Sequence, residues 1–257
     1  MINFAIPDGH QMKHVLQFFD KIGFRFEGYQ SDMLNRRPVL TVLTEDSKNI
    51  MDYPEKIFTK VIRPQDMPSH VAAGHFDVAI TGTDWLREHK IRFPESPVTN
   101  LVSLGFGKVR LVAAIQEDLP VNNIEELKQY LTSNYPDRYF RIASEYAYIA
   151  DHYALTNKLP RYQIIMTYGA TESLIPEDAE MIIENTETGN TLRKNRLRIL
   201  DTLFGSEGCL IVNANSLKHP EKALVIRKLE MIFCNYSGTK AQSNKGTKER
   251  HKNSKKA

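Results

Sequence analysis

Residues 76–89 read FDVAITGTDWLREH, and this stretch decides the fold class. Its first half, residues 76–82, is a mostly apolar run of the kind found in strands that are buried on both faces. Its second half, residues 83–89, has the pattern of a helix with Asp84 in the first turn. A buried strand that passes directly into a helix is the unit from which α/β proteins with parallel sheets are built.

The same alternation continues in both directions along the chain. Further strands are expected at 2–6, 38–44, 56–62, 109–115, 138–144, 162–169, 179–184 and 208–214. Further helices are expected at 10–23, 66–74, 123–133, 145–157, 190–203 and 220–233. Such regular alternation predicts an α/β fold with mostly parallel sheets, in which ligands bind at the carboxyl ends of strands beside helix N-termini.

Composition is that of an ordinary globular protein, with 41% apolar and 25% charged residues. The 257 residues suffice for one large domain or two small ones. No apolar run approaches the roughly 18–20 residues of a membrane span, and the N-terminal MINFAIPDGHQ lacks the pattern of a secretory signal. Cys209 and Cys234 are most simply reduced thiols. We therefore expect a cytoplasmic protein that has no membrane partner.

The basic charge is concentrated at the C-terminal end. Residues 235–257 contain seven Lys or Arg and one Glu, whereas residues 1–234 contain 27 basic and 30 acidic residues. This tail has few apolar residues to offset the entropy cost of ordering, so we expect it to be disordered. Because the rest of the chain is slightly acidic, a solvated tail is favoured over one that binds nucleic acid.

Three loops at predicted strand ends hold residues that suit anions. Pro7 and Gly9 lie between the first strand and the first helix, where glycine lets backbone N–H groups approach a ligand, although a plain turn explains them too. Arg63 and Asp84 each stand beside a helix start. Asp84 alone is explained by capping, and the two helix starts together suit an anion or nucleotide site.

Arg110 lies within the apolar strand predicted at 109–115, where burial of a lone charge would be costly. A salt-bridge partner and a bound phosphate explain it equally well. Gly105 and Gly107 loosen the backbone just before this strand and favour a crossing between two domains.

Residues 184–191, ENTETGNT, combine carboxylates with a short loop. Glu184 and Glu187 suit ribose hydroxyls or Mg²⁺, and Thr188 to Thr191 suit a phosphate at the start of the helix expected at 190–203. A capped helix has the same short pattern, while the Walker A and G-x-G-x-x-G motifs are absent. The bases that follow, at 193–198, are expected to face solvent or a partner subunit.

Four stretches together resemble ATP phosphoribosyltransferase, the enzyme that opens histidine biosynthesis. They are IRPQDMPSHVAAGHFDVAITGTDWL (62–86), GFGKVRLVAA (105–114), YGATESLIP (168–176) and ENTETGNTLRKNRLRILDTL (184–203). The similarity runs in order from about residue 2 to residue 230.

The resemblance implies a two-lobed fold like that of type II periplasmic binding proteins, with two sheets and the active-site cleft between them. It places a first, discontinuous domain at 1–105 plus 190–234 and a second at 106–189, with the chain crossing near 104–108 and 185–195. The basic tail, 235–257, lies outside both.

The reaction implied is the Mg²⁺-dependent transfer of 5-phosphoribosyl from 5-phosphoribosyl-1-pyrophosphate (PRPP) to N1 of ATP, with release of pyrophosphate. Adenine N1 attacks without losing a proton, which agrees with the lack of an evident Ser–His or Cys–His pair in the sequence. The rival interpretation is a non-catalytic, ligand-binding paralogue on the same fold.

By resemblance, the PRPP loop comprises Glu184, Glu187, Thr188, Gly189, Asn190 and Thr191. The arginines assigned to pyrophosphate and ATP phosphates, and so to catalysis, are Arg63 and Arg37. The weaker candidates for ATP or phosphate binding are Pro7, Gly9, Asp84 and Arg110. Glu184 and Glu187 are also candidates to contact Mg²⁺ carried by PRPP.

Two departures from the family pattern stand out. The first loop commonly reads Pro-Lys-Gly-Arg, whereas this chain has Pro7-Asp8-Gly9-His10, and Ala147 replaces a usual proline. The C-terminal regulatory domain of long members is not matched here. The resemblance therefore implies either a short form, which works with a separate regulatory subunit, or a long form that has lost its end. We also expect a homo-oligomer.

Overall fold

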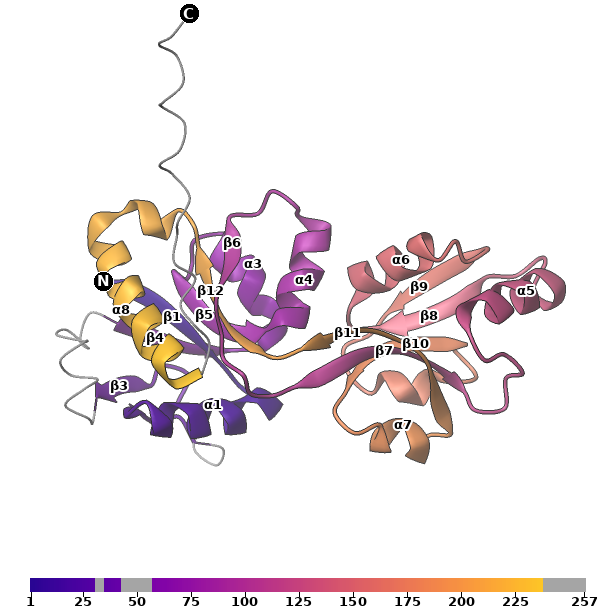
Figure 1. The fold of residues 1–257 in the computed structure, drawn as a ribbon, viewed down its shortest axis with the longest axis horizontal. Coiled ribbons are helices and arrows are strands. Elements are labelled where there is room, and N and C mark those ends of the chain that lie inside the picture. The colour runs from indigo at the N-terminus through magenta and orange to yellow at the C-terminus, as the bar shows by residue number, and fades with distance from the viewer. Residues whose placement is uncertain (31–34, 43–56, 238–257) are drawn as a thin grey trace, which may run out of the picture.

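The computed structural model describes residues 1–30, 35–42 and 57–237. These residues form two lobes, each built round a five-stranded sheet (Figure 1). The chain enters the second lobe once and returns once, so the first lobe contains both the beginning of the chain and α8 (Pro220–Ser237). Strands alternate with helices through both lobes, which confirms the predicted α/β class.

The sheet of the first lobe has the strand order β4-β1-β5-β12-β6. The bounds are β1 (Ile2–Pro7), β4 (Ile57–Ile62), β5 (Val78–Gly82), β6 (Val98–Ser103) and β12 (Gly208–Asn213). β1 runs parallel to β4 and β5, while β12 is antiparallel to β5 and β6. Because β1, β4 and β5 are parallel, the loops that follow them leave the sheet at the same edge.

Helices cover this sheet and bury a core in which aliphatic side chains surround a cluster of aromatic rings. They are α1 (His10–Lys21), α3 (Met67–Ala72), α4 (Thr83–Arg92) and α8, with the short 3-10 helices η2 (Pro64–Asp66) and η4 (Ser216–Lys218). Met12, Val15 and Phe19 recur at helical spacing on α1 and are buried, which agrees with the helix expected at 10–23. Phe233 of α8 packs edge-on against Phe18 of α1 at 5.2 Å between ring centroids. A two-stranded sheet of β2 (Phe24–Glu27) and β3 (Val39–Val42) adds to this lobe.

The sheet of the second lobe has the strand order β11-β7-β10-β8-β9. The bounds are β7 (Val109–Gln116), β8 (Phe140–Ser144), β9 (Tyr162–Met166), β10 (Met181–Thr186) and β11 (Leu197–Ser206). The helices of this lobe are α5 (Ile124–Asn134), α6 (Ala147–Thr156), η3 (Thr171–Leu174) and α7 (Asn190–Lys194). β8, β9 and β10 are parallel, so their carboxyl ends also share an edge.

The helix predicted at 190–203 is wrong beyond its first five residues. α7 ends at Lys194, and Arg196 adopts a positive φ of 55°. The chain then forms β11, which pairs antiparallel with β7 over most of its length. Leu192 and Leu197 are buried against Val112 of β7. Pairing with a strand that lies 81 to 97 residues earlier in the sequence therefore overrides the local helical pattern.

The two crossings of the chain lie at 104–108 and at 206–208. The first agrees with the expected position, whereas the second comes later than the predicted 185–195, because α7 and β11 pack on the second sheet. Residues 190–206 thus lie with 106–189 and not with the first lobe, where the predicted division placed them. The independence of the two lobes as domains stays a prediction.

Hydrogen bonds join the two crossings to one another. Gly208 N donates to Phe106 O at 2.8 Å, and Leu104 N donates to Gly208 O at 2.8 Å. A Cβ on Gly208 would lie 2.4 Å from the Phe106 ring, so only glycine allows this approach. The lobes are therefore joined by a paired, closely packed double crossing.

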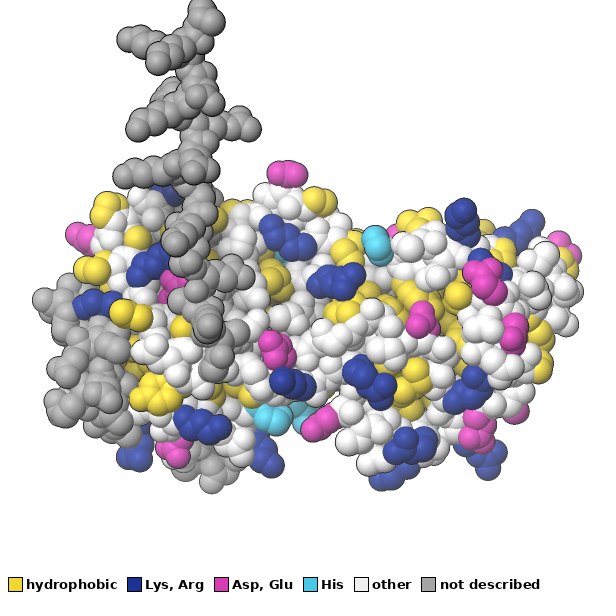
Figure 2. Space-filling model, in the orientation of Figure 1, with side chains coloured by type: hydrophobic (Ala, Val, Ile, Leu, Met, Phe, Trp, Pro, Cys, Tyr) yellow, Lys and Arg dark blue, Asp and Glu magenta, His cyan; other side chains and the backbone are white. Residues whose placement is uncertain are grey.

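The surface carries mixed charge. Over the face shown in Figure 2, basic and acidic side chains of the described residues are interspersed and do not form one basic patch. Among the described helices, none is both long enough and apolar enough to cross a bilayer. The predicted tail begins at residue 235, but α8 continues to Ser237, and residues 238–257 lie outside the described part.

Candidate functional site

Three predicted site segments meet at one edge of the first sheet. Pro7 ends β1, Arg63 follows β4, and Asp84 lies in the first turn of α4 directly after β5. Since these three strands are parallel neighbours, the sheet topology brings their ends together although they are up to about 75 residues apart in sequence.

The first loop contains an ion pair that the sequence did not reveal. Arg36 donates to Oδ2 of Asp8 at 2.6 Å, and Tyr29 donates its hydroxyl proton to Pro7 O. Gly9 stands at the N-cap position of α1 with φ 65°, a conformation that favours glycine. A cation thus accompanies the acid that replaces the family's usual lysine.

Arg37, which was predicted as a catalytic residue, lies next to that ion pair. Its side chain is exposed, and its backbone N–H donates to Oδ1 of Asn35 at 2.9 Å. Arg36 O accepts a 3.0 Å hydrogen bond from Val61 N, which holds this segment along β4. Arg36 and Arg37 are therefore both at the edge of the sheet where the site residues gather.

Arg63 is exposed and precedes η2. Its charge acts across the junction on Glu145 of the second lobe: burial raises the pKa of Glu145, and Arg63 opposes that rise. Asp66, predicted to cap the next helix, occupies the N-cap position of α3 without a side-chain capping bond. Arg63 is therefore an exposed cation whose charge reaches the second lobe.

Asp84 is buried and is more than a helix cap. Its Oδ2 accepts from the Tyr146 hydroxyl at 2.9 Å, its Oδ1 accepts from Trp85 N at 2.9 Å, and its own N–H donates to Ser206 Oγ at 3.0 Å. Burial raises the pKa of Asp84 despite these hydrogen bonds. A Cβ on Gly82 would lie 2.0 Å from Asp84 Oδ1, so the glycine makes room for the carboxylate.

The matching edge of the second sheet carries Glu184. Its pKa is raised to about 7, chiefly by burial and also by the nearby carboxylates of Glu145 and Glu172, while hydrogen bonds from Asn185 N and Thr171 oppose the shift. A carboxyl group with this pKa changes its charge near neutral pH. The sequence predicted Glu184 but missed Glu145 and Glu172.

The loop after β10 is preformed. Gly189 N donates to the buried Thr186 Oγ at 2.9 Å, and Gly189 itself has φ 75°. Arg193 folds back over the loop and donates to Asn190 Oδ1 at 2.5 Å and to Thr188 O at 3.3 Å. The side chains of the loop that remain exposed to a ligand are those of Glu187, Thr188, Asn190 and Thr191.

Arg110 is exposed, so the expectation that its charge is buried within the strand is wrong. It pairs in register with Thr186 on the neighbouring β10. Directly opposed residues of an antiparallel pair project from the same face of the sheet. Arg110 therefore stands at the base of the loop that contains Thr188, and no desolvation cost needs to be offset there.

Only some of the bases that follow the loop face solvent. Arg193, Lys194 and Arg196 are exposed, although Arg193 braces the loop. Arg198 instead donates to the backbone oxygens of Glu117 at 3.3 Å and Leu119 at 2.9 Å. The bases at 193–198 thus divide between Arg193, which braces the loop, and Arg198, which supports the 117–121 turn.

Tyr146 joins the two edges. Its hydroxyl donates to Asp84 in the first lobe and accepts from Asn185 Nδ2 in the second at 3.0 Å. Glu88 of α4 adds a second contact by accepting from Tyr148 N at 2.9 Å and Ile149 N at 2.8 Å at the start of α6. The sequence did not predict a role for Tyr146, because its partners Asp84 and Asn185 lie 62 and 39 residues away and leave no local signal.

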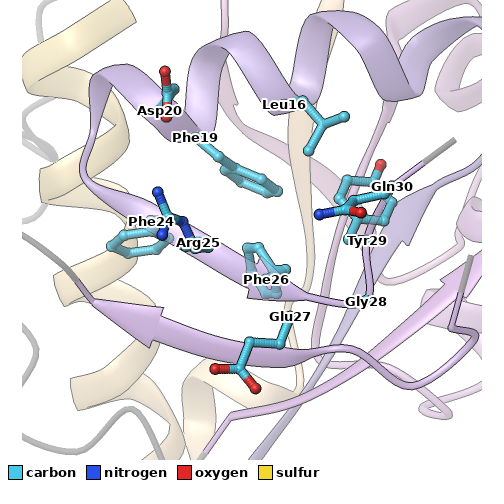
Figure 3. Close-up of a pocket in the computed structure, with 10 residues that line it drawn as sticks. All are labelled: Leu16, Phe19, Asp20, Phe24, Arg25, Phe26, Glu27, Gly28, Tyr29 and Gln30. Carbon is cyan, nitrogen blue, oxygen red and sulfur yellow. The ribbon is translucent and has the colours of Figure 1, made fainter. Parts of the chain in front are cut away.

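A cavity of about 600 Å³ lies elsewhere in the first lobe, between α1 and β2. Figure 3 shows Phe19 and Phe26 beside Tyr29 along its apolar side, with Arg25 and Glu27 at the strand. Among its described lining residues there is no predicted site residue. Within the described ranges, no cluster of three or more His, Cys, Asp or Glu could hold a metal ion without help from a ligand.

Comparison with known proteins gives consistent results. A family model for HisG, ATP phosphoribosyltransferase, matches residues 63–232. The ATP phosphoribosyltransferase of Methanocaldococcus jannaschii is 31% identical over 233 residues, which are 89% of this chain and 70% of that protein.

Solved structures agree on the fold. The ATP phosphoribosyl transferase (HisG:HisZ) complex from Thermotoga maritima contains a chain with a TM-score of 0.65 at 24% identity, covering 91% of this chain and 100% of that one. The Candida albicans CA3427 gene product, described as having the generic periplasmic binding protein fold, gives a TM-score of 0.53 at 9% identity and covers 92% of this chain and 70% of that one. The two-lobed, periplasmic-binding-protein-like architecture is thereby confirmed.

Proposed function

The chain belongs to the ATP phosphoribosyltransferase family, and we propose how its two lobes divide the reaction of that family between them. The family transfers 5-phosphoribosyl from PRPP to ATP in the first step of histidine biosynthesis. The second lobe binds PRPP, and the first lobe binds ATP and the departing pyrophosphate.

The chemistry requires alignment and charge stabilisation more than proton transfer. Adenine N1 attacks ribose C1 through its lone pair, the bond from C1 to the pyrophosphate oxygen breaks, and both electrons of that bond leave with pyrophosphate. The chain must hold two polyanions in line and stabilise the charge that develops on the leaving group. Exposed arginines and backbone N–H groups at loop ends supply this without a nucleophilic side chain.

On the second lobe, the ribose hydroxyls of PRPP are assigned to Glu184 and Glu187. The 5-phosphate is assigned to the loop of residues 188–191, with the hydroxyls of Thr188 and Thr191 as donors. The Gly189 N–H is engaged by Thr186 and fixes the shape of this loop. Arg110, initially assigned to the ATP side, is placed here because it pairs with Thr186 at the base of the loop.

On the first lobe, Arg63 and Arg37 are assigned to the pyrophosphate and the ATP phosphates. Pro7 and Gly9 provide the backbone of the first phosphate-facing loop, beside the Arg36–Asp8 ion pair. Asp84 is buried and fully engaged by three hydrogen-bonding partners, so it orients the site and does not itself contact phosphate.

Mg²⁺ fits this site as an ion that arrives with PRPP. It prefers oxygen ligands and usually keeps several waters while contacting one or two carboxylates, which agrees with a site that offers Glu184 and Glu187 but no dedicated protein cage among the described residues. When bound, the ion would neutralise part of the negative charge on pyrophosphate.

Assembly and location complete the proposal. The structural relative from Thermotoga maritima is a HisG:HisZ complex, and we extend to this chain a homo-oligomeric core that works with a separate regulatory subunit. Cytoplasmic location and the absence of membrane and nucleic-acid partners remain sequence-based predictions.

The observation that carries this division is the effect of Arg63, in the first lobe, on Glu145, which in turn raises the pKa of Glu184 in the second. The pyrophosphate must leave from the ribose toward the first lobe. Arg63 faces the ribose site from that lobe and can stabilise the charge on the leaving group. Arg63→Gln should lower kcat by about 100-fold or more, as expected for loss of one preorganised charge. A kcat within a factor of three of the unsubstituted protein would remove Arg63 from the catalytic assignment.

A further inference from the structure

We infer that Tyr146 is a positioning residue for PRPP: its hydroxyl, anchored on Asp84 of the first lobe, fixes Asn185 and thereby the end of β10 that carries Glu184. The inference rests on the proposed assignment of Glu184 to the ribose of PRPP. It adds a residue that makes no contact with substrate and acts through its neighbour.

Tyr146 is held in place independently of any ligand. It is fully buried, and its ring stacks on Trp85 with 4.1 Å between ring centroids and an interplanar angle of 21°. Its backbone N–H donates to Ser144 Oγ at 2.9 Å, and Ser144 Oγ donates to Ile183 O of β10 at 2.6 Å. The ring therefore cannot move without disturbing both α4 and β10.

The hydroxyl has a defined direction. A phenol has one proton to donate, and Asp84 Oδ2 is a pure acceptor at 2.9 Å, so the proton lies toward Asp84. The oxygen then accepts from Asn185 Nδ2 at 3.0 Å. Burial and the Asp84 charge raise the pKa of Tyr146 well above its usual value, which keeps the hydroxyl protonated and this direction constant.

Fixing Asn185 fixes its two neighbours. Asn185 N donates to Glu184 Oε1 at 2.8 Å, so the position of this backbone N–H sets one carboxylate oxygen. On the other side, Thr186 Oγ accepts from Gly189 N and sets the phosphate loop. Asn185 is exposed, and without the hydroxyl its amide would turn toward water and release this strand end.

The test compares Tyr146→Phe with a matched tyrosine on the same helix. Tyr153 lies in α6, whose N-cap is Tyr146; it is buried and donates its hydroxyl to a carboxylate, Asp201 Oδ2 at 3.1 Å, on β11 and not on β10. Steady-state KM and kcat are measured for PRPP and for ATP in Tyr146→Phe, Asn185→Ala, the double variant and Tyr153→Phe, with thermal unfolding in parallel.

Tyr146→Phe and Asn185→Ala should each raise the KM for PRPP about tenfold, the size of one lost hydrogen bond, and change the KM for ATP less than twofold. The double variant should be no worse than either single variant, because both act through one chain of contacts. Tyr153→Phe should leave both KM values unchanged. Asn185 is exposed, so its variant reports on PRPP even where Tyr146→Phe folds poorly.

Three results would overturn the inference: an unchanged KM for PRPP in Tyr146→Phe, equal rises in the KM for PRPP and ATP, or additive effects in the double variant. Calorimetry of PRPP with Glu184→Gln separates this failure from a failure of the proposed function. If Glu184→Gln binds PRPP normally, the ribose assignment is wrong and the inference falls with it. If it binds weakly while Tyr146→Phe binds normally, only the role of Tyr146 is wrong.

Discussion

Arg36 donates a 2.6 Å hydrogen bond to Oδ2 of Asp8, and this ion pair places a cation beside the loop in which this chain lacks the family's usual lysine. The Asp8 side chain is 18% exposed and that of Arg36 is 56% exposed, so the arginine keeps donors free toward solvent. The acid that departs from the family pattern is thus partly neutralised by a residue from a distant segment. This arrangement favours catalysis over a degenerate paralogue.

Arg36→Gln should therefore raise the KM for ATP, because the Asp8 carboxylate is left unpaired next to the loop assigned to ATP phosphates. A rise of about three- to tenfold is expected, the size of a like-charge interaction near the surface. The double variant Arg36→Gln with Asp8→Asn should recover most of the affinity. If the double variant is as weak as Arg36→Gln alone, the arginine acts directly on ATP and neutralisation of Asp8 is not its role.

PRPP binding should depend on pH through Glu184. Its pKa is raised to about 7 from a usual 4.5, so the group is largely protonated at pH 6 and largely ionised at pH 8. The ionised form is the better acceptor for ribose hydroxyls, and PRPP affinity should rise across this range. The groups that face Glu184 are the carboxylates of Glu145 and Glu172, the Asn185 N–H and the Thr171 hydroxyl.

Stability should change in the opposite direction. Because the folded pKa is above the unfolded one, the protonated form is favoured in the folded protein, and this contribution to stability is present below pH 4.5 and is lost as pH rises through 7.

The pH dependence of PRPP affinity is measured by calorimetric titration of PRPP into the unsubstituted protein and into Glu184→Gln from pH 6 to pH 8. The ionisation of PRPP itself contributes equally in both proteins. An identical pH dependence in the two proteins would show that Glu184 does not titrate in binding.

Thr188→Ala should weaken PRPP binding about tenfold, since it removes one hydroxyl donor assigned to the 5-phosphate. ATP binding should change less than twofold. Thr132→Ala is the control, because its hydroxyl donates to Lys128 O on the surface of α5 at 2.9 Å. Equal losses for PRPP and ATP, measured by calorimetry, would remove the assigned role of the loop.

Asp77 should be important for stability and not for catalysis. It is buried, and its carboxylate accepts from Asn3 N at 2.8 Å, Ser216 Oγ at 2.5 Å and Lys222 Nζ at 2.7 Å. Burial would raise its pKa, but the hydrogen bonds from Lys222 and Ser216 outweigh burial and the pKa is lowered.

Asp77→Asn should lower the free energy of unfolding by about 2–3 kcal/mol, because a mostly buried, paired carboxylate is lost. The control Glu125→Gln breaks a pair whose acid is 70% exposed and should cost less than about 0.5 kcal/mol. Because the pKa of Asp77 is lowered, its contribution to stability is present at neutral pH and is lost as pH falls through the folded pKa. The free energies of unfolding of Asp77→Asn and the unsubstituted protein should therefore converge in acid. Urea unfolding at pH 7 and at pH 3 tests this, and a constant difference would contradict it.

Much of the fold was predictable because its signals are local. The run at 76–82 is mostly apolar and all five residues of β5 within it are buried. Both β5 and α4 lie where the sequence predicted a strand and a helix. The helix expected at 190–203 failed because its second half completes a sheet with β7, and no local pattern encodes a distant pairing. β6 was also not predicted, because only Val98 and Val102 of its six residues are buried and the apolar signal is weak.

The candidate site, like the fold, could be predicted from the sequence only in part. The loop at 184–191 could be proposed as a site from its residue order, whereas the Asp84–Tyr146–Asn185 contact joins segments that are 39 to 62 residues apart. Arg36 and Arg37 are adjacent and chemically identical, so only the fold shows that Arg36 pairs with Asp8. Contacts that depend on how two lobes meet are not readable from one sequence.

The most direct test of the account is the formation of the adduct itself. Purified protein is incubated with ATP, PRPP and Mg²⁺, with pyrophosphatase present to draw the reaction forward, and the products are followed by mass spectrometry. The account predicts N1-(5-phosphoribosyl)-ATP in amounts that depend on all three components. No adduct, whether the chain is tested alone or with a candidate regulatory subunit, would contradict it.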